Sequence, residues 1–271
     1  MTGTHILAFS SIIFYLIAAL LIARKLFNEQ SIDQKDKTFA LLLGTAGLTL
    51  HAFVLHTGLM ATHGINLNLV NVASLVAWLI AALLLIGSIK QPMESLAIIF
   101  FPVAALCLIV EQLVPEQEQI ASGLALGLQL HILFSVLSYS LLSIAALQAM
   151  LLAIADARLK NRHPMPLMRV LPPLQKMETH LFLLIWLGFT LLTISLITGF
   201  PFIDDILGQH LIHKTVLSVI AWIVFAILLC GRLRFGWRGR MAIRFTLAGM
   251  ITLLLAYFGS KAVLELILHT A

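Results

Sequence analysis

Residues 6–23 read ILAFSSIIFYLIAALLIA, a stretch with no charged side chain, and Arg24 and Lys25 follow it directly. An α-helix needs about 20 mostly apolar residues to cross the hydrocarbon core of a bilayer. The stretch therefore predicts a membrane-spanning helix. Because the positive charges follow the apolar run rather than precede it, the segment lacks the charged start of a cleaved signal peptide. We expect a permanent span that enters the membrane from the outer side.

The composition extends this prediction to the whole chain. Of the 271 residues, 61% are hydrophobic and 11% are charged, whereas about a quarter of the residues of a soluble domain are charged. This composition predicts that the lipid bilayer surrounds most of the chain. The net charge is +5, but the basic residues fall in short loops between apolar runs, where they orient a membrane protein. We therefore expect the bilayer as a partner and no nucleic acid.

Seven further segments have the length and apolar character of a span, and the sequence shows no alternating pattern typical of transmembrane β-strands. The fold class predicted is all-α, a polytopic membrane helix bundle of about eight transmembrane helices. We expect a single integral membrane domain over residues 1–271. The predicted spans cover residues 5–25, 38–61, 69–89, 95–113, 127–155, 181–200, 211–231 and 242–267.

The distribution of lysine and arginine predicts the orientation of these spans. Of the 17 basic residues, 15 lie in or beside the loops that follow the odd-numbered spans, and the even-numbered loops contain none. Cytoplasmic loops of membrane proteins carry this excess of positive charge. The odd-numbered loops are therefore expected in the cytoplasm, which places both termini on the non-cytoplasmic side.

The histidines are distributed as unevenly as the basic residues. Seven of the ten fall at or beyond the predicted outer ends of spans, namely His5, His56, His63, His131, His210, His213 and His269. Neutral imidazole is a common ligand of metals and of haem iron, so an outward cluster predicts a binding site. His51 lies near the middle of the second span, where a polar side chain is costly and usually faces a cavity or a partner. An interfacial histidine can also be an amphipathic side chain with its tip in headgroup water, and spacing alone does not show that these residues converge.

The sequence contains no motif of a conventional enzyme. It has no HExxH metal motif, no glycine-rich phosphate loop and no nucleophile elbow. Cys107 and Cys230 lie far apart and belong to neither CxxC nor CxxCH, so we interpret them as small apolar side chains. We expect a protein that is not an enzyme.

Several motifs together resemble the cytochrome c assembly (CcsA/ResC/CcmC-type) family of membrane proteins. In the C-terminal half they are KTVLSVIAW at 214–222, Arg232, GWRGR at 236–240 and YFGSK at 257–261. In the N-terminal half they are His51, NLNLVNVASL at 66–75 and HILFSVLSY at 131–139. The resemblance covers nearly the whole chain and points to the YpjD- and HemX-like subgroup.

The resemblance implies a multi-pass protein of a bacterial inner (plasma) membrane with both termini on the periplasmic side. It implies that the bundle holds or handles non-covalent haem near the outer face, with other membrane proteins of cytochrome assembly as partners. His131 matches the outer-face ligand of haem iron in the family, and His51 matches the intramembrane one. The chain departs from the family at 208–217, GQHLIHKTVL, where only Lys214 remains of a tryptophan-rich WDPKE segment. His210 and His213 occupy this segment and become candidates for a second outer ligand.

Two alternatives from other functional classes stay open. A scaffolding or regulatory subunit would keep the fold without haem, which agrees with the lost tryptophans. A small-solute transporter would show internal repeats and spans broken by Gly or Pro at matching positions. Pro102, within the fourth predicted span, is the one such break noted in the sequence.

Overall fold

The computed structural model describes residues 2–27, 34–61, 64–90, 93–114, 120–121, 123–160, 173–202 and 212–259. Within these residues, eight helices are long and apolar enough to cross a membrane. The predicted polytopic all-α fold is therefore confirmed. The helices pack as two compact units, which divide after Gly123. Each unit is described by itself, and the single domain expected over 1–271 stays a prediction.

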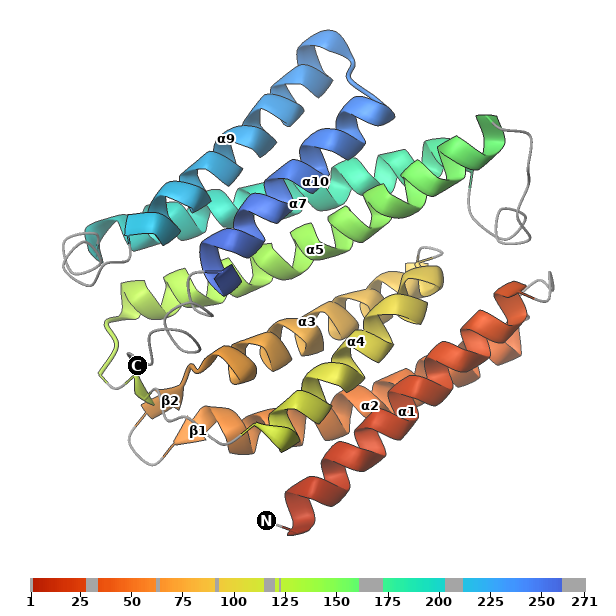
Figure 1. Cartoon of the computed structure of the whole chain (residues 1–271), viewed down its shortest axis with the longest axis vertical. Coiled ribbons are helices and arrows are strands. Elements are labelled where there is room, and N and C mark those ends of the chain that lie inside the picture. Colours follow the sequence, from red (N-terminus) through yellow and green to blue (C-terminus); the bar gives the residue numbers. More distant parts are fainter. Residues whose placement is uncertain are drawn as a thin grey trace. The chain divides into compact units, whose positions relative to one another are not determined.

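The first unit contains four of the long helices and three short strands (Figure 1). Its strands pair antiparallel in the order β1-β2-β3 at the end of α2 and the start of α3, with Met60 opposite Ile65 and Ile65 opposite Ala121. Hydropathy did not predict this small sheet. The elements are α1 (Thr2–Phe27), α2 (Gln34–Leu59), β1 (Met60–Ala61), β2 (Gly64–Asn66), α3 (Leu69–Lys90), α4 (Glu94–Leu113) and β3 (Ile120–Ala121).

The second unit contains the other four long helices. They are α5 (Leu126–Lys160), α7 (Leu174–Gly199), α9 (Ile212–Phe235) and α10 (Arg240–Leu254). A 3-10 turn, η1 (Phe200–Phe202), follows α7, and a π-helical turn, η2 (Leu255–Gly259), extends α10. Helix α7 begins before its predicted span because its first turns are helical but polar. The predicted end of the eighth span, 260–267, lies outside the described residues.

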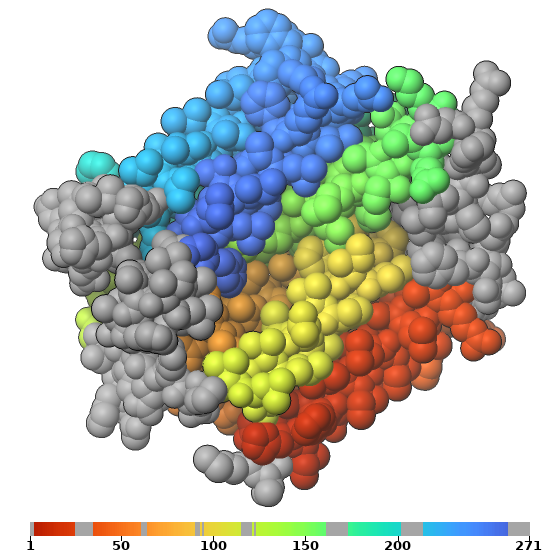
Figure 2. Space-filling view, in the orientation of Figure 1, coloured from red at the N-terminus to blue at the C-terminus, as the bar shows by residue number. Residues whose placement is uncertain are grey.

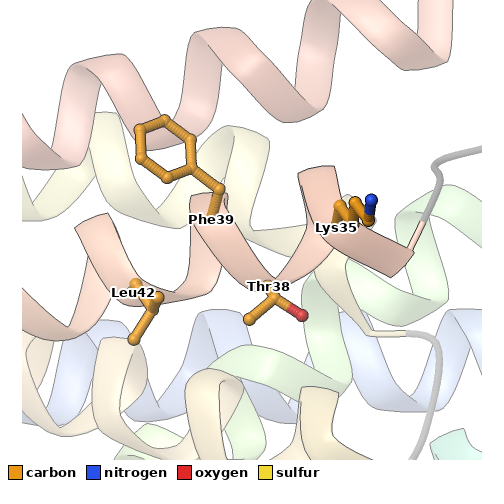
Figure 3. Close-up of a pocket in the computed structure, with 4 residues that line it drawn as sticks. All are labelled: Lys35, Thr38, Phe39 and Leu42. Atoms are coloured by element: carbon orange, nitrogen blue, oxygen red, sulfur yellow. The ribbon is translucent and has the colours of Figure 1, made fainter.

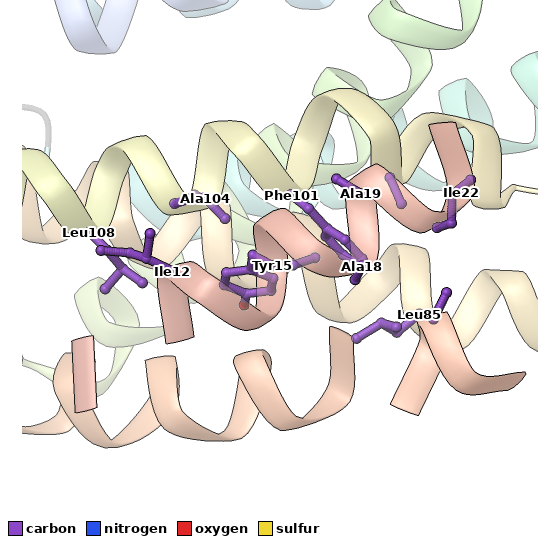
Figure 4. Packing of buried hydrophobic residues seen from close by; sticks show 14 of the residues in the cluster. Ile12, Tyr15, Ala18, Ala19, Ile22, Leu85, Phe101, Ala104 and Leu108 are labelled. Atoms are coloured by element: carbon purple, nitrogen blue, oxygen red, sulfur yellow. The ribbon is translucent and has the colours of Figure 1, made fainter. Parts of the chain in front are cut away.

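Small side chains allow close helix packing in the first unit. Ala18 and Ala19 of α1 and Ala104 and Ala105 of α4 are all buried in one cluster, and Tyr15 contacts the ring of Phe101 at 5.3 Å between centroids (Figure 4). In a membrane, where lipid is as apolar as leucine, helix association depends on such close packing. Figure 2 shows α1, in red, and α4, in yellow, side by side along their length.

The four helices of each unit have the same neighbours. In the first unit α1 packs against α2 and α4, and α3 closes the ring by packing against the same two helices. In the second unit α5 packs against α7 and α10, and α9 packs against the same two. Both units are therefore closed four-helix bundles with one connectivity, in which α1, α2, α3 and α4 correspond to α5, α7, α9 and α10.

Sequence motifs follow this correspondence. Residues 47–59 of α2 read GLTLHAFVLHTGL, and 188–200, at the end of α7, read GFTLLTISLITGF. Residues 74–78 of α3 read SLVAW, and 218–222 of α9 read SVIAW. Residues 17–20 of α1 and 144–147 of α5 both read IAAL. The second unit thus repeats the first in sequence as well as in helix order.

Hydrogen bonds between helices repeat at the same places. The Ser11 hydroxyl of α1 donates to the carbonyl of Gly47 at 2.7 Å, and the Ser138 hydroxyl of α5 donates to the carbonyl of Gly188 at 2.8 Å. The indole of Trp78 donates to the carbonyl oxygen of Leu48 at 2.9 Å. In the second unit the indole of Trp222 reaches the same stretch of α7 and donates to the Thr193 hydroxyl at 2.9 Å. The Ser–Gly contact is therefore shared by the two bundles, and the two tryptophans join corresponding helices through different acceptors.

Candidate functional site

The first bundle contains a chain of polar side chains, one from each helix. His51 of α2 is fully buried, with 0% exposure. Its Nδ1 lies 3.3 Å from the hydroxyl of Tyr15 on α1, and its Nε2 lies 3.0 Å from the hydroxyl of Ser74 on α3. The Ser74 hydroxyl donates to Oε2 of Glu111, on the last turn of α4, at 2.7 Å. The chain connects a buried imidazole with a carboxylate near the helix end.

Asparagines at the start of α3 fix the position of Ser74. The side-chain oxygen of Asn68 accepts from the backbone N–H of Asn71 at 2.7 Å, which is the capping interaction that starts a helix. The Asn71 amide donates to the carbonyl oxygens of Gly58 at 2.8 Å and Asn66 at 3.2 Å. These contacts tie the start of α3 to the end of α2. Ser74, one turn further along α3, is thereby held beside His51.

The second bundle contains a different polar cluster around His131. The Nδ1 of His131, on the second turn of α5, lies 2.7 Å from the backbone carbonyl oxygen of Ser195 on α7. A carbonyl can only accept, so Nδ1 carries the proton and Nε2 carries the lone pair. Nε2 has no hydrogen-bond partner among the described residues. The hydroxyls of Ser135 and Ser195 lie 2.6 Å apart, and the Ser195 hydroxyl lies 3.3 Å from Nδ1 of His131.

Two further features lie on the helices that carry this cluster. Gly199, at the end of α7, provides room for the ring, because a Cβ there would lie 2.5 Å from Nδ1. Tyr139 lies on the same helix two turns from His131, and its hydroxyl is buried without a hydrogen-bond partner within the described part of the chain. A buried hydroxyl of this kind is an unsatisfied donor that a bound molecule can satisfy.

The predicted site residues are divided between the two units. His51 belongs to the first unit and His131 to the second. His210 lies outside the described residues, as does the side chain of His213, at the start of α9. Among the described residues, no group of three or more His, Cys, Asp or Glu side chains is placed to hold a metal ion.

A surface hollow in the structure lies elsewhere. It is lined by Lys35, Thr38, Phe39 and Leu42, all from the first turns of α2 (Figure 3). It contains none of the predicted site histidines. Phe39 and Leu42 are exposed apolar side chains of a predicted span, so this hollow is best explained as lipid-facing surface.

Sequence reasoning missed the partners of both histidines. The link from Glu111 through Ser74 to His51 was not foreseen, and Tyr15 and Ser195 were not singled out. The signal available was a polar side chain inside each apolar run, and a serine or tyrosine is too common in spans to identify a partner. Only the packing of the helices shows which polar side chains meet.

Comparisons with known proteins match most of this chain. The family model described as Cytochrome C assembly protein matches residues 42–268. Inner membrane protein YpjD of Escherichia coli strain K12 is 34% identical over 233 residues, which cover 85% of this chain and 88% of that protein. An uncharacterized 28.8 kDa protein in the nifR3-like 5' region of Azospirillum brasilense is 37% identical over 143 residues, or 52% of this chain and 53% of that protein. No solved structure matches the chain significantly.

Proposed function

Since the chain belongs to the cytochrome c assembly family of membrane proteins, and is a multi-pass inner membrane protein, we propose that it binds and handles haem non-covalently. The proposal assigns it no conventional enzymatic activity. Its partners would be haem, the bilayer and other membrane proteins of cytochrome assembly. The predicted orientation, with both termini in the periplasm, puts His131 near the outer face.

One observation supports His131 as the axial ligand of haem iron. Its Nδ1–H is engaged by the Ser195 carbonyl at 2.7 Å, which leaves the Nε2 lone pair available. Histidines that ligate metals characteristically donate their other N–H to a carbonyl or carboxylate, which fixes the tautomer and orients the ring. Haem bound there would supply its redox-active iron. The chain's own contribution is the orientation of this ring by Ser195 and the space left by Gly199.

The other predicted ligands have different roles in this proposal. His210 or His213 would supply a second outer ligand from the segment where the family carries tryptophans. His51 would act as the intramembrane residue that ligates or relays haem. In the present conformation both of its ring nitrogens are hydrogen-bonded and its side chain is buried, so ligation there requires one hydrogen bond to open.

Visible absorption of the detergent-purified protein, with and without added hemin and before and after reduction, tests the proposal. We expect a Soret band that weakens strongly in His131→Ala and is unchanged in His56→Ala, a control at an exposed position of α2. Tyr139→Phe and His51→Ala would be titrated in parallel. A protein that takes up no hemin, or a band insensitive to His131→Ala, would contradict the assignment and favour the haem-free scaffold.

The repeated bundles favour a transporter as the second candidate, because internal repeats are a mark of many transporter folds. Such transporters also have membrane spans broken by Gly or Pro at matching positions. In this chain the proline of α4 has no matching break in α10. Pro102 of α4 corresponds to Leu247 of α10 when the buried positions of the two helices are aligned. Uptake of small solutes by vesicles that contain the protein, compared with uptake by empty vesicles, would distinguish a transporter from a haem-binding protein.

A further inference from the structure

The repeat supplies an internal comparison for the polar chain of the first bundle. Aligning the paired motifs places His51 opposite Leu192 and Tyr15 opposite Leu142, and the buried positions of α4 and α10 place Glu111 opposite Ala256. These three counterparts are buried and apolar, and Ser74 corresponds to Ser218. A bundle of this connectivity therefore packs without the polar chain. Tyr15, His51 and Glu111 are thus not demanded by the fold.

The second bundle shows the converse. Ser135 and Ser195, which lie at His131, correspond to Ala8 and Val54 of the first bundle, and both of these are buried. Each bundle has polar side chains where its counterpart is apolar. Buried polar groups in a membrane bundle cost free energy unless they are paired and usually mark a function. The hydrogen-bonded side chains at His51 are therefore a feature of the first bundle alone, separate from the cluster at His131.

The hydrogen bonds of this chain have a defined direction. A carboxylate accepts and does not donate, so the Ser74 hydroxyl donates its hydrogen bond to Glu111 at 2.7 Å. The oxygen of Ser74 is then the acceptor for Nε2–H of His51 at 3.0 Å. Nδ1 is left with the lone pair, to which the Tyr15 hydroxyl donates at 3.3 Å. This last contact is the longest of the three.

We propose that Glu111 and Ser74 are positioning residues that hold His51 in the Nε2–H tautomer, so that Nδ1, beneath the Tyr15 hydroxyl, is its electron-pair donor. The Tyr15 hydroxyl donates to this atom, and both side chains are fully buried. The tautomer depends only on this chain of contacts and not on the haem binding proposed above.

The test is made without haem. Nitrogen-15 chemical shifts of histidine-labelled protein in nanodiscs distinguish protonated from unprotonated ring nitrogens, and His51→Ala identifies the His51 signals. We expect Nε2–H in the wild type. Glu111→Gln introduces an amide that can donate to Ser74 and reverse the chain, so we expect the Nδ1–H form to grow in this variant. Ser74→Ala should also mix the two forms, whereas the matched control Ser218→Ala should not.

A wild-type His51 in the Nδ1–H form would overturn the proposal. So would Glu111→Gln and Ser74→Ala spectra in which the His51 tautomer is unchanged. These variants keep a side chain of similar or smaller volume, and circular dichroism shows whether the helices have formed in each. A folded variant with an unchanged tautomer therefore counts against positioning.

Discussion

The hydroxyl of Ser138 donates to the backbone carbonyl of Gly188 at 2.8 Å and joins α5 to α7 at a point where the helices pack closely. The pair Ser11 and Gly47 makes the same contact between α1 and α2. In both bundles a glycine on one helix exposes its carbonyl to a serine on the other. Small residues at such crossings allow backbones to approach and polar groups to pair across the interface.

Gly188→Ala is expected to destabilise the second bundle. An added Cβ would lie 2.7 Å from both Cγ and Cδ2 of Leu142, a side chain with no exposed surface, so a core residue must shift. Overpacking of this kind costs about 1–3 kcal/mol. Denaturant titration in mixed micelles, followed by circular dichroism, measures the loss. Gly47→Ala is the matched variant and should cost less, because its nearest neighbours would lie at 3.2 and 3.4 Å. Equal costs would contradict this reading of the two crossings.

The number and type of elements could be predicted because each span is an apolar run of bilayer length. The amphipathic start of α7, with Gln175 and Lys176, could not be predicted by hydropathy, since polar residues at a membrane edge look like a loop. The repeat also escaped sequence reasoning. Its matching positions are mostly interchangeable apolar residues. Trp78 and Trp222 become informative only when the structure shows that each indole bonds to the preceding helix of its own bundle.

The site was predictable only in part. His51 stood out because a histidine at bilayer depth is costly. The structure gives it hydrogen-bond partners on α1 and α3, and Ser74 links it to Glu111 of α4. Its role as a haem ligand remains a prediction, as do the roles of His131, His210 and His213. Contacts such as Ser195 to His131 depend on the angle and depth at which two helices cross. One sequence does not contain that information in a readable form.

Glu178 is expected to stabilise the predicted cytoplasmic end of the second bundle. Its carboxylate, 16% exposed, accepts from Arg232 at 3.1 Å and from Arg238 at 3.2 Å. The Arg232 guanidinium also lies 4.5 Å from the ring centroid of Phe182. Glu178→Ala leaves two guanidinium groups without this partner, so we expect a loss of about 1–3 kcal/mol in unfolding free energy.

Asp156→Ala is the control for the Glu178 variant. The ion pair of Asp156 with Arg240 is longer, 3.6 Å, and both side chains are largely exposed. Exposed pairs contribute about 0–1 kcal/mol. The two variants would be compared by denaturant titration at low and high salt. If removal of Asp156 cost as much as removal of Glu178, burial would not be the factor that makes this contact important.

Gly199→Ala is expected to weaken hemin binding without removing any ligand. The new Cβ would lie 2.5 Å from Nδ1 of His131 and 2.8 Å from its Cε1, so the ring must leave the Ser195 carbonyl. We expect about tenfold weaker binding, which corresponds to about 1.4 kcal/mol, measured by Soret titration. Gly44→Ala produces a comparable clash, at 2.8 Å from the ring of Phe101, in the first bundle. A similar loss in that control would indicate general destabilisation rather than displacement of His131.

The orientation predicted from the basic residues can be checked with single cysteines. In a background in which Cys107 and Cys230 are replaced by alanine, Gly3→Cys puts a thiol at the start of α1, where a Cβ has no neighbour within 4 Å. Arg158→Cys puts one near the end of α5, at an exposed position. When spheroplasts are treated with a membrane-impermeant maleimide, the reagent should label only the Gly3→Cys variant.

The same reagent should label Arg158→Cys after the inner membrane is permeabilised, which shows that the thiol is reactive. Because helix α5 begins near His131 and ends near Arg158, labelling at 158 from the intact outer side would place His131 at the cytoplasmic face. The reverse pattern would leave the eight spans in place. It would overturn the periplasmic haem site, because His131 would then lie at the cytoplasmic face and the basic loops would lie in the periplasm.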